Sequence, residues 1–370
     1  MYLAANSPAA ESESSGPVQT QAPADAWPVF RGNASATGVA ASPLPDELQV
    51  VWKRSFKDSG FEATAAIVGD TVYAPSLDGN LYALALANGD ERWKFPTELG
   101  FKAAPAVRDG VIYIGDSDGR FYAIDAASGQ EKWSIDTGAE ISAGANFYHD
   151  KVLVGSQDGS LYCLNAADGE LVWKYSIDNM IQCAPTVMEN RCFLAGCDGK
   201  LHIIDLDRGE AVAKVEIQDP TNSTPAAAGD FVYFGTQGGK LFAVNWREAD
   251  VAWTYQHARR KQPIQSAPAV AEGLVVFGGR NRMIHGIDAK DGVEQWTFTA
   301  RSRVDSSCVV VGQRVYVGSG DGRLYGLDLK SGDKVWEYEA GGAFSASPAV
   351  AAGRLVIGNE TGDLFCFGSQ

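Results

Sequence analysis

Residues 104–135, with the sequence APAVRDGVIYIGDSDGRFYAIDAASGQEKWSI, contain four short apolar runs separated by three turn pairs. The runs are rich in Val, Ile, Tyr and Phe, and the pairs Asp109-Gly110, Asp118-Gly119 and Ser128-Gly129 tolerate the backbone of tight turns. This pattern is typical of successive antiparallel hairpins, and no helical segment fits between the runs. We therefore predict a four-stranded antiparallel meander.

The same unit recurs about every forty residues along the chain. Its second turn is marked by Asp78-Gly79, Asp118-Gly119, Asp158-Gly159, Asp198-Gly199 and Asp321-Gly322, and in diverged copies by Gly238-Gly239, Asn281-Arg282 and Thr361-Gly362. One meander of this length cannot bury both of its faces, so the copies must pack face to face around an axis. We predict an all-β fold, a single eight-bladed β-propeller of four-stranded antiparallel blades over residues 27–370.

Seven tryptophans share one position in the repeat and mark the predicted outermost strand: Trp52, Trp93, Trp133, Trp173, Trp253, Trp296 and Trp336. We interpret them as structural anchors between blades. Blade four has Ala213 at this position, so we expect it to be locally softer. The eighth unit ends before its fourth strand, and residues 49–53, with Trp52 in register, precede the first complete unit. We predict that this N-terminal strand completes blade eight and closes the ring, which removes an exposed sheet edge.

The composition separates a tail from the propeller. Residues 1–26 are rich in Ala, Ser and Pro and poor in apolar side chains, so we expect a disordered tail. No transmembrane segment and no signal peptide are visible in this sequence. The net charge of −15 argues against a nucleic-acid partner, because phosphate contacts require a basic surface. The six cysteines show no metal-ligand spacing, and we expect most of them in the core; Cys183 and Cys197, which neighbouring strands of blade four could bring close, are the one candidate for an intramolecular disulfide.

The segment from Ala123 to Trp133 resembles the tryptophan-docking repeat of the quinoprotein β-propellers, Ala-x-Asp-x-x-Thr/Ser-Gly-x-x-x-Trp, and variants recur in nearly every unit. Residues 27–32, Trp-Pro-Val-Phe-Arg-Gly, also look like the start of PQQ-like repeat proteins. This superfamily includes enzymes that use pyrroloquinoline quinone (PQQ) and non-catalytic relatives such as the outer-membrane assembly lipoprotein BamB. The resemblance implies the fold and leaves both kinds of activity open.

The chain departs from both groups. Its length and its lack of a Cys-Cys dipeptide differ from the quinoprotein alcohol dehydrogenases, and it lacks the lipidated cysteine of BamB-like adaptors. The resemblance suggests that, in a dehydrogenase, Asp305 acts as the base and Glu62 and Asn222 bind calcium. Histidines form no catalytic arrangement, and His202 and His285 occupy a core position of the third strand. We predict no catalytic residue and no metal site.

Alignment of the innermost strands reveals one column that is polar in every unit: Glu62, Lys102, Ser142, Gln182, Asn222, Gln265, Asp305 and Ser345. The next columns carry small residues, which crowding near the axis requires. We expect this polar ring to line the mouth of the central channel, where it holds either water or a small polar ligand.

A second candidate site is a group of cations, the basic sector, in loops that open on the same face: Arg259, Arg260, Lys261, Arg280, Arg282, Arg301 and Arg303. The corresponding loops elsewhere are acidic. Arginine offers bidentate contacts to carboxylates and phosphates, so we interpret the sector as a site for an anionic ligand or an acidic partner segment; solvated ion pairing is the alternative.

These features lead to three hypotheses. The first is a non-enzymatic binding or scaffold propeller of the bacterial cell envelope, similar to BamB, that needs no cofactor and recognises another protein or a small anionic ligand through the channel-mouth face. The alternative is an oxidoreductase that uses PQQ and calcium at the polar ring. The third is a sensor of a cell-wall sugar or peptide. Fold alone does not decide among them.

Overall fold

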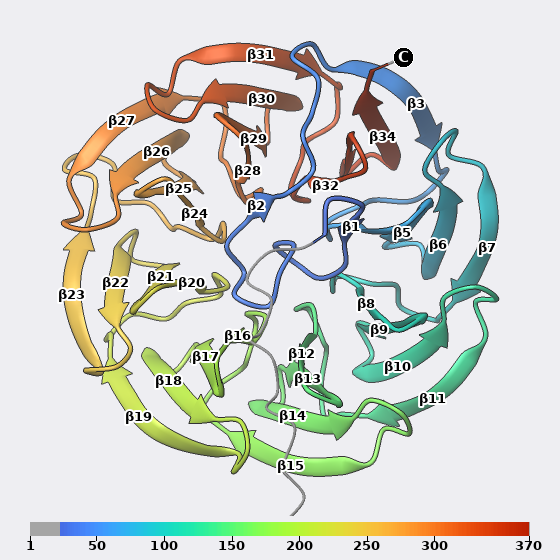
Figure 1. The fold of residues 1–370 in the computed structure, drawn as a ribbon, viewed down its shortest axis with the longest axis horizontal. Helices are drawn as coiled ribbons and strands as arrows, with labels where there is room; N and C mark the ends of the chain where they lie inside the picture. Colours follow the sequence, from blue (N-terminus) through green and yellow to red (C-terminus); the bar gives the residue numbers. More distant parts are fainter. Residues whose placement is uncertain (1–22, 370) are drawn as a thin grey trace, which may run out of the picture.

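The computed structural model describes residues 23–369, which form a ring of eight four-stranded antiparallel blades. Figure 1 shows the blades arranged around a central axis, as the repeat predicted. Neighbouring first strands contact one another around the axis, so the first strand of each blade is the innermost. No helix long and apolar enough to cross a membrane occurs within these residues.

The first four blades follow one another along the chain. Their strands are β4 (Ala66–Val68), β5 (Thr71–Pro75), β6 (Asn80–Ala85) and β7 (Glu91–Pro96) in blade 1; β8 (Ala106–Arg108), β9 (Val111–Gly115), β10 (Arg120–Asp125) and β11 (Glu131–Asp136) in blade 2; β12 (Asn146–Tyr148), β13 (Lys151–Ser156), β14 (Ser160–Asn165) and β15 (Leu171–Ser176) in blade 3; and β16 (Thr186–Met188), β17 (Arg191–Ala195), β18 (Lys200–Asp205) and β19 (Glu210–Glu216) in blade 4.

The remaining blades repeat this order, and the last one borrows a strand. Their strands are β20 (Ala226–Ala228), β21 (Phe231–Gly235), β22 (Leu241–Asn245) and β23 (Asp250–Tyr255) in blade 5; β24 (Ala269–Ala271), β25 (Leu274–Gly279), β26 (Met283–Asp288) and β27 (Glu294–Thr299) in blade 6; β28 (Val309–Val311), β29 (Arg314–Gly318), β30 (Arg323–Asp328) and β31 (Lys334–Glu339) in blade 7; and β32 (Ala349–Ala351), β33 (Arg354–Gly358), β34 (Asp363–Gly368) and β3 (Gln49–Ser55) in blade 8.

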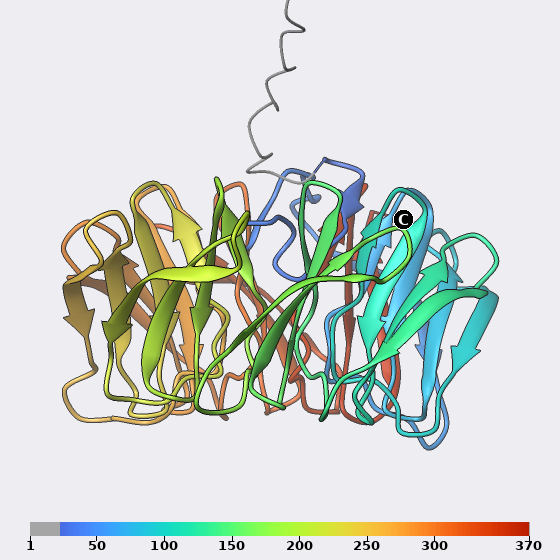
Figure 2. The same cartoon turned by 90° about the horizontal axis from the view of Figure 1, so that it is seen from below.

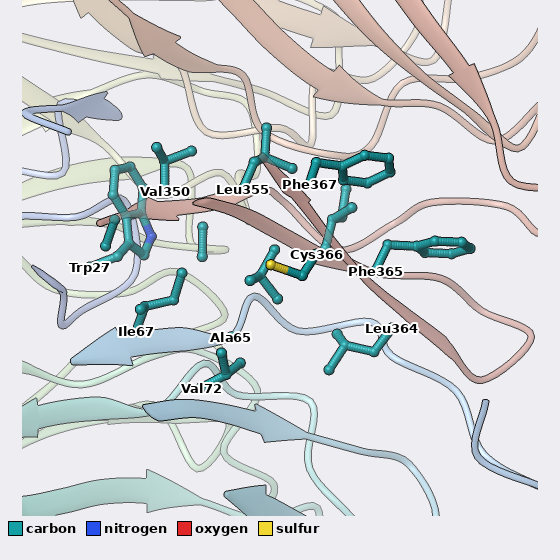
Figure 3. Packing of buried hydrophobic residues seen from close by; sticks show 14 of the residues in the cluster. Trp27, Ala65, Ile67, Val72, Val350, Leu355, Leu364, Phe365, Cys366 and Phe367 are labelled. Atoms are coloured by element: carbon teal, nitrogen blue, oxygen red, sulfur yellow. The ribbon is translucent and has the colours of Figure 1, made fainter. Parts of the chain in front are cut away.

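Ring closure by the N-terminal strand is confirmed. Strand β3 pairs antiparallel with β34, with Trp52 opposite Cys366. The closing blade shares a hydrophobic cluster with blade 1, in which Phe365 and Phe367 of β34 and Val72 of β5 are buried. Figure 3 shows these side chains from both ends of the chain packed together. Closure therefore joins the first and last parts of the chain through a continuous core.

All seven tryptophans of the repeat lie on outermost strands, as predicted. Six of them donate the indole N–H to a carbonyl of the next blade, and their rings cover a glycine in that blade. Trp93, for example, donates to the Ala126 carbonyl at 3.2 Å, and a Cβ on Gly129 would lie 2.7 Å from its ring. Each of these six anchors therefore requires a glycine partner.

Blade 4 has no tryptophan on its outermost strand, and a tryptophan of the next blade fills the interface instead; that blade 4 is locally softer stays a prediction. Trp246, in the turn after β22 of blade 5, is buried beside Phe193 of blade 4 and donates to the Gly229 carbonyl at 3.0 Å. The small Ala213 packs against the same cluster. Ala249 occupies the position that is glycine in most other blades, since no ring covers it here. The tryptophan at this interface thus comes from blade 5 instead of blade 4, and it fills the space between the two blades.

One end of the channel is closed by residues 24–42, which we call the N-terminal plug. Figures 1 and 2 show this segment crossing the axis on one face of the ring, away from the loops at the opposite face. Two short strands belong to it: β1 (Ala26–Trp27), antiparallel to β4, and β2 (Val39–Ala40), parallel to β28. The predicted tail, residues 1–26, lies outside the described residues up to residue 22, and its last residues belong to this plug.

The plug satisfies backbone donors on the innermost edge of the ring. Its carbonyls at Pro28, Ala34, Ser35, Thr37, Gly38 and Ala24 accept N–H bonds at 2.7 to 2.9 Å from Val107, Val187, Ala227, Val270, Val310 and Ala352, respectively. In blade 3 the side chain of Asn146 donates to the Ala34 carbonyl at 2.8 Å instead. Together with β1 on blade 1, these bonds connect the plug to all eight blades. A buried N–H without a partner costs about 1–3 kcal/mol, so the plug stabilises the inner edge of the ring.

Candidate functional site at the open mouth of the channel

The polar ring lines the end of the channel that the plug leaves open. All eight of its residues, from Glu62 in blade 1 to Ser345 in blade 8, surround one cavity of about 160 Å³. The residue before each of them, such as Phe101 or Ile141, is buried in the blade, which directs the ring residue toward the axis. The repeat thus correctly identified which side chains share the mouth; that they bind a ligand stays a prediction.

Phe30 of the plug forms part of the cavity wall. It lies against blades 2 and 3, where the inner strands carry Ala104 and Gly144; a Cβ on Gly144 would approach the Phe30 Cβ to 3.2 Å. The small residues at these two positions make room for the ring of Phe30. The open part of the cavity therefore faces the other blades.

Several ring side chains are already engaged by neighbours. The Gln237 amide donates to Asn222 Oδ1 at 2.7 Å, and Lys102 lies 3.2 Å from Glu140. Asp305 accepts from Arg280 Nε at 2.9 Å and lies 3.1 Å from Arg303 Nε. Glu62 is exposed and has no hydrogen-bond partner on its side chain within residues 23–369. The mouth consequently combines ring side chains that neighbours hold in place with others, such as Glu62 and Ser345, that have no partner in the described part of the chain.

The basic sector divides into two groups. Arg280 and Arg303 hold Asp305 between them, and Arg303 also lies 3.8 Å from Glu360. Arg260 donates to the Asn281 carbonyl at 3.3 Å. The other four side chains are exposed and form neither an ion pair nor a side-chain hydrogen bond with any residue that the structure describes: Arg259, Lys261, Arg282 and Arg301. We call these four the free cations.

The residues suggested for a quinone enzyme are not arranged for that role. Glu62 and Asn222 belong to blades 1 and 5, which lie opposite each other in a ring of eight, and both oxygens of Asp305 accept bonds from arginines. No group of three His, Cys, Asp or Glu side chains suited to a metal exists between residues 23 and 369. Calcium requires six to eight oxygen ligands. This donor set does not fit calcium-bound PQQ.

The core positions predicted for His202 and His285 agree with the structure, since both side chains are buried. His202 lies between Asp198 at 2.9 Å and the Tyr175 hydroxyl at 2.8 Å. His285 is stacked on Phe277, and burial, with a smaller effect of His257, lowers its pKa to about 3. Both are held in the interior, away from the cavity.

The cysteines behave as core residues, as expected. Five are buried, and none of the six forms a disulfide, including the pair Cys183 and Cys197. Burial raises the pKa of Cys183 to about 12. A thiol with so high a pKa is a poor nucleophile at neutral pH, so Cys183 adds no chemistry to the mouth.

The sequence profile of one protein family, described as the outer membrane protein assembly factor BamB, matches the chain in three overlapping segments, residues 45–146, 123–263 and 197–370. The chain belongs to this family. The resemblance noted in the repeats is thus confirmed over all eight blades. No curated protein matches this BamB-family propeller.

Solved structures with the same fold include a BamB, an alcohol dehydrogenase and a designed protein. BamB from Moraxella catarrhalis superposes with a TM-score of 0.75 at 18% identity, covering 87% of this chain and 100% of that chain. The quinohemoprotein alcohol dehydrogenase from Comamonas testosteroni gives a TM-score of 0.78 at 14% identity, covering 94% and 81%. A computationally designed protein, Ika8, gives a TM-score of 0.74 at 16% identity, covering 87% and 100%. At these identities the likeness shows the fold alone.

Sequence reasoning missed the contribution of the plug to the site of this BamB-family propeller. Phe30 lines the cavity and Arg31 lies buried behind its wall, yet neither belongs to the forty-residue repeat. The sequence signal for the plug was the run from Trp27 to Gly32. In the structure Gly32 has a φ of 85°, and a Cβ added to it would lie 2.7 Å from the Trp27 ring. A large ring directly above a glycine indicates a compact local fold rather than a linker.

Proposed function

We propose that this chain is a non-enzymatic binding propeller of the bacterial cell envelope that takes an acidic segment of a partner protein on its channel-mouth face. The free cations carry this proposal. They lie together in one sector of a protein whose net charge is −15, and none of them forms an ion pair with a described carboxylate. Electrostatic attraction of this kind steers a partner of opposite charge and sets its orientation.

Two further features support a role in binding. The plug closes the opposite end of the channel and engages the inner edge of every blade, so the mouth face is presented on a rigid ring. Membership of the BamB family favours an envelope location and a task in the assembly of outer-membrane proteins. A rigid surface loses little conformational entropy on binding, which favours recognition through loops.

Site-specific photo-crosslinking in the native cell tests the proposal. A photoreactive residue replaces Arg282 in the mouth loops or, as a control, Lys290 in a turn on the opposite face. We expect an envelope protein to be crosslinked at the first position only. The interaction should weaken as the salt concentration rises, because exposed charges are screened. The same product from both positions contradicts the proposal.

A charge-removal variant gives the quantitative test with the partner thus identified. Its four substitutions are Arg259→Gln, Lys261→Gln, Arg282→Gln and Arg301→Gln. A matched variant removes four exposed cations elsewhere: Lys132→Gln, Arg208→Gln, Lys290→Gln and Lys330→Gln. Exposed charge pairs contribute about 0–1 kcal/mol each, so four of them contribute up to about 4 kcal/mol together; we expect the first variant to lose about tenfold or more in affinity and the second to lose little. Equal losses of affinity in the two variants would mean that the net charge of the protein, and not the position of the free cations, determines the affinity.

The PQQ- and calcium-dependent oxidoreductase remains the second candidate, because the fold is shared with a quinohemoprotein alcohol dehydrogenase. The arrangement of Glu62, Asn222 and Asp305 disfavours it. Titration of the purified chain with PQQ, with and without calcium, separates the two functions. Saturable, calcium-dependent binding that persists at high salt, with dye-linked turnover, replaces the binding proposal by the enzymatic one. The sensor of a cell-wall sugar or peptide is tested by the same titration with those ligands.

A further inference from the structure

A set of hydroxyl groups lies in the channel between the polar ring and the plug. Two residues after the ring position, blades 1, 5, 7 and 8 carry Thr64, Thr224, Ser307 and Ser347, which line the cavity and are buried. The other four blades have Ala or Gly at this position. We call these four residues the hydroxyl arc.

Each oxygen of the arc accepts a backbone N–H from the preceding blade. Thr224 accepts from Ala184 at 2.9 Å, Ser307 from Ala267 at 2.9 Å, Ser347 from Ser307 at 2.9 Å, and Thr64 from Ser347 at 3.3 Å. None of the four hydroxyls donates to an acceptor within residues 23–369. Their protons are therefore left for an occupant of the cavity, and an O–H that accepts a bond is a stronger donor.

A fifth donor points to the same occupant. Ser345 belongs to the polar ring of blade 8, and its Oγ is buried and has no hydrogen-bond partner in the described part of the chain. Buried hydroxyls without a partner are rare in proteins and cost free energy. Ser345 lies two residues before Ser347, on the segment that leads into β32 of blade 8. Four of the five donors thus lie on the side of blades 7, 8 and 1, and the other, Thr224, belongs to blade 5.

A buried positive charge, that of Arg31, lies behind the wall of the cavity. Arg31 of the plug is 1% exposed and donates to the carbonyls of Pro268 and Cys308, the residues that directly follow the cavity residues Ala267 and Ser307. Its Nε and Nη1 have no hydrogen-bond partner, and no described carboxylate pairs with it. Burial lowers the pKa of Arg31 to about 10, so the group is charged at neutral pH. A buried cation without a counter-charge is costly, and an anion nearby offsets that cost.

We propose that the channel binds a small inorganic anion of the halide class at the hydroxyl arc, with Arg31 as its counter-charge. The donors are hydroxyl protons, which favour an anion over a cation. Phe30 fills the side of blades 2 and 3, and a cavity of about 160 Å³ holds such an ion with several waters. Glu62 at the mouth opposes the anion, whereas Asp305 is neutralised by Arg280 and Arg303. The site is independent of the free cations.

Crystals of the full chain soaked in bromide give the direct test. We expect an anomalous peak inside the channel, among Thr64, Ser307, Ser345 and Ser347. The second measurement is the Tm of the chain as chloride replaces gluconate at constant ionic strength. Binding to the folded state alone should raise the Tm by a few degrees. The absence of an anomalous peak from the channel, together with a Tm that does not change with chloride, overturns the proposal and leaves water as the occupant.

Single substitutions locate the site. Ser345→Ala removes a hydroxyl that has no partner, so it should leave the fold intact and reduce the rise in Tm with chloride. The matched control is Ser142→Ala, at the corresponding ring position of blade 3, where Gln157 Nε2 already donates to the hydroxyl at 3.2 Å. This variant should keep the full chloride effect. Arg31→Met should abolish it. An unchanged chloride effect in both Ser345→Ala and Arg31→Met contradicts the proposal.

Discussion

At the scale of single residues, one position of the third strand shows how side chains vary in pairs. Tyr82, Tyr162 and Tyr325 donate their hydroxyls to an aspartate four residues earlier, at 2.7, 2.5 and 2.6 Å. Tyr122 uses Asp116 at 2.8 Å, and His202 uses Asp198. Blades 5 and 8 have Phe at this position, and there the aspartate of the turn is replaced by Gly238 and Thr361. In these seven blades an aspartate is present where a tyrosine or histidine bonds to it, whereas blade 6 pairs His285 with Asn281 at 3.0 Å.

The displaced anchor Trp246 gives the first prediction. Trp246→Ala should destabilise the fold by about 3–5 kcal/mol, similar to Trp133→Ala, because it empties the interface between blades 4 and 5. The free energy of unfolding in urea measures both. Adding Ala213→Trp and Ala249→Gly to Trp246→Ala restores the arrangement of the other blades and should recover part of the loss. A cost below about 1 kcal/mol for Trp246→Ala would show that blade 4 is soft, as the sequence had suggested.

The second prediction concerns His285, whose folded pKa of about 3 lies below the ordinary value of 6.5. The unfolded chain therefore takes up the proton first, so this histidine lowers stability as the pH falls from about 6.5 toward 3. Between pH 7 and pH 5 this histidine lowers the free energy of unfolding by about 2 kcal/mol. His285→Phe should remove that share of the acid sensitivity in urea unfolding. The exposed His149→Gln is the control; equal pH dependence in wild type and His285→Phe contradicts the argument.

At the scale of elements, the blades follow from the repeat and the plug does not. Alternating apolar runs and turn pairs predicted every blade, the closing strand β3 and the polar ring, because each copy confirms the others. Residues 24–42 occur once, so no second copy reveals their conformation. The partners of the ring side chains, such as the arginines on Asp305, also escaped prediction, since they depend on distances between neighbouring blades.

Gly32 tests the conformation of the plug. Its φ is 85° and a Cβ added to it would lie 2.7 Å from the Trp27 ring, so Gly32→Ala adds a clash to the cost of a left-handed backbone. Gly69→Ala is the matched change, with a φ of 58° and no atom within 4 Å. We expect about 1–2 kcal/mol for Gly69→Ala and about 1–3 kcal/mol more for Gly32→Ala. Equal losses of unfolding free energy would mean that the plug adapts without strain.

At the scale of the whole molecule, closure turns a linear array of repeats into a ring. Open arrays can unfold from their ends, whereas a closed ring has no terminal blade. The interface of Trp52 with blade 1 is the place where the ring is joined by distant parts of the chain, and its indole donates to the Leu86 carbonyl at 2.8 Å. Loss of this joint should affect how cooperatively the protein unfolds as well as its stability.

Trp52→Ala and Trp133→Ala make the same chemical change at the joint and inside the ring. Wild type and Trp133→Ala should unfold in one transition in which fluorescence and circular dichroism coincide. For Trp52→Ala we expect the two probes to separate and the slope of the transition in urea to fall, because blades near the joint open first. Coincident transitions in Trp52→Ala would show that β3 and the plug hold the ring closed without this side chain.

The polar ring has a consequence for how the family diversifies. Each blade contributes one side chain to the mouth, from a position that the buried residue before it orients and that the fold does not otherwise use. The eight positions of the polar ring can therefore change one at a time, and the duplication or exchange of a blade replaces one of the eight side chains. If the mouth binds a ligand as we propose, its selectivity can change by one blade at a time while the architecture stays the same.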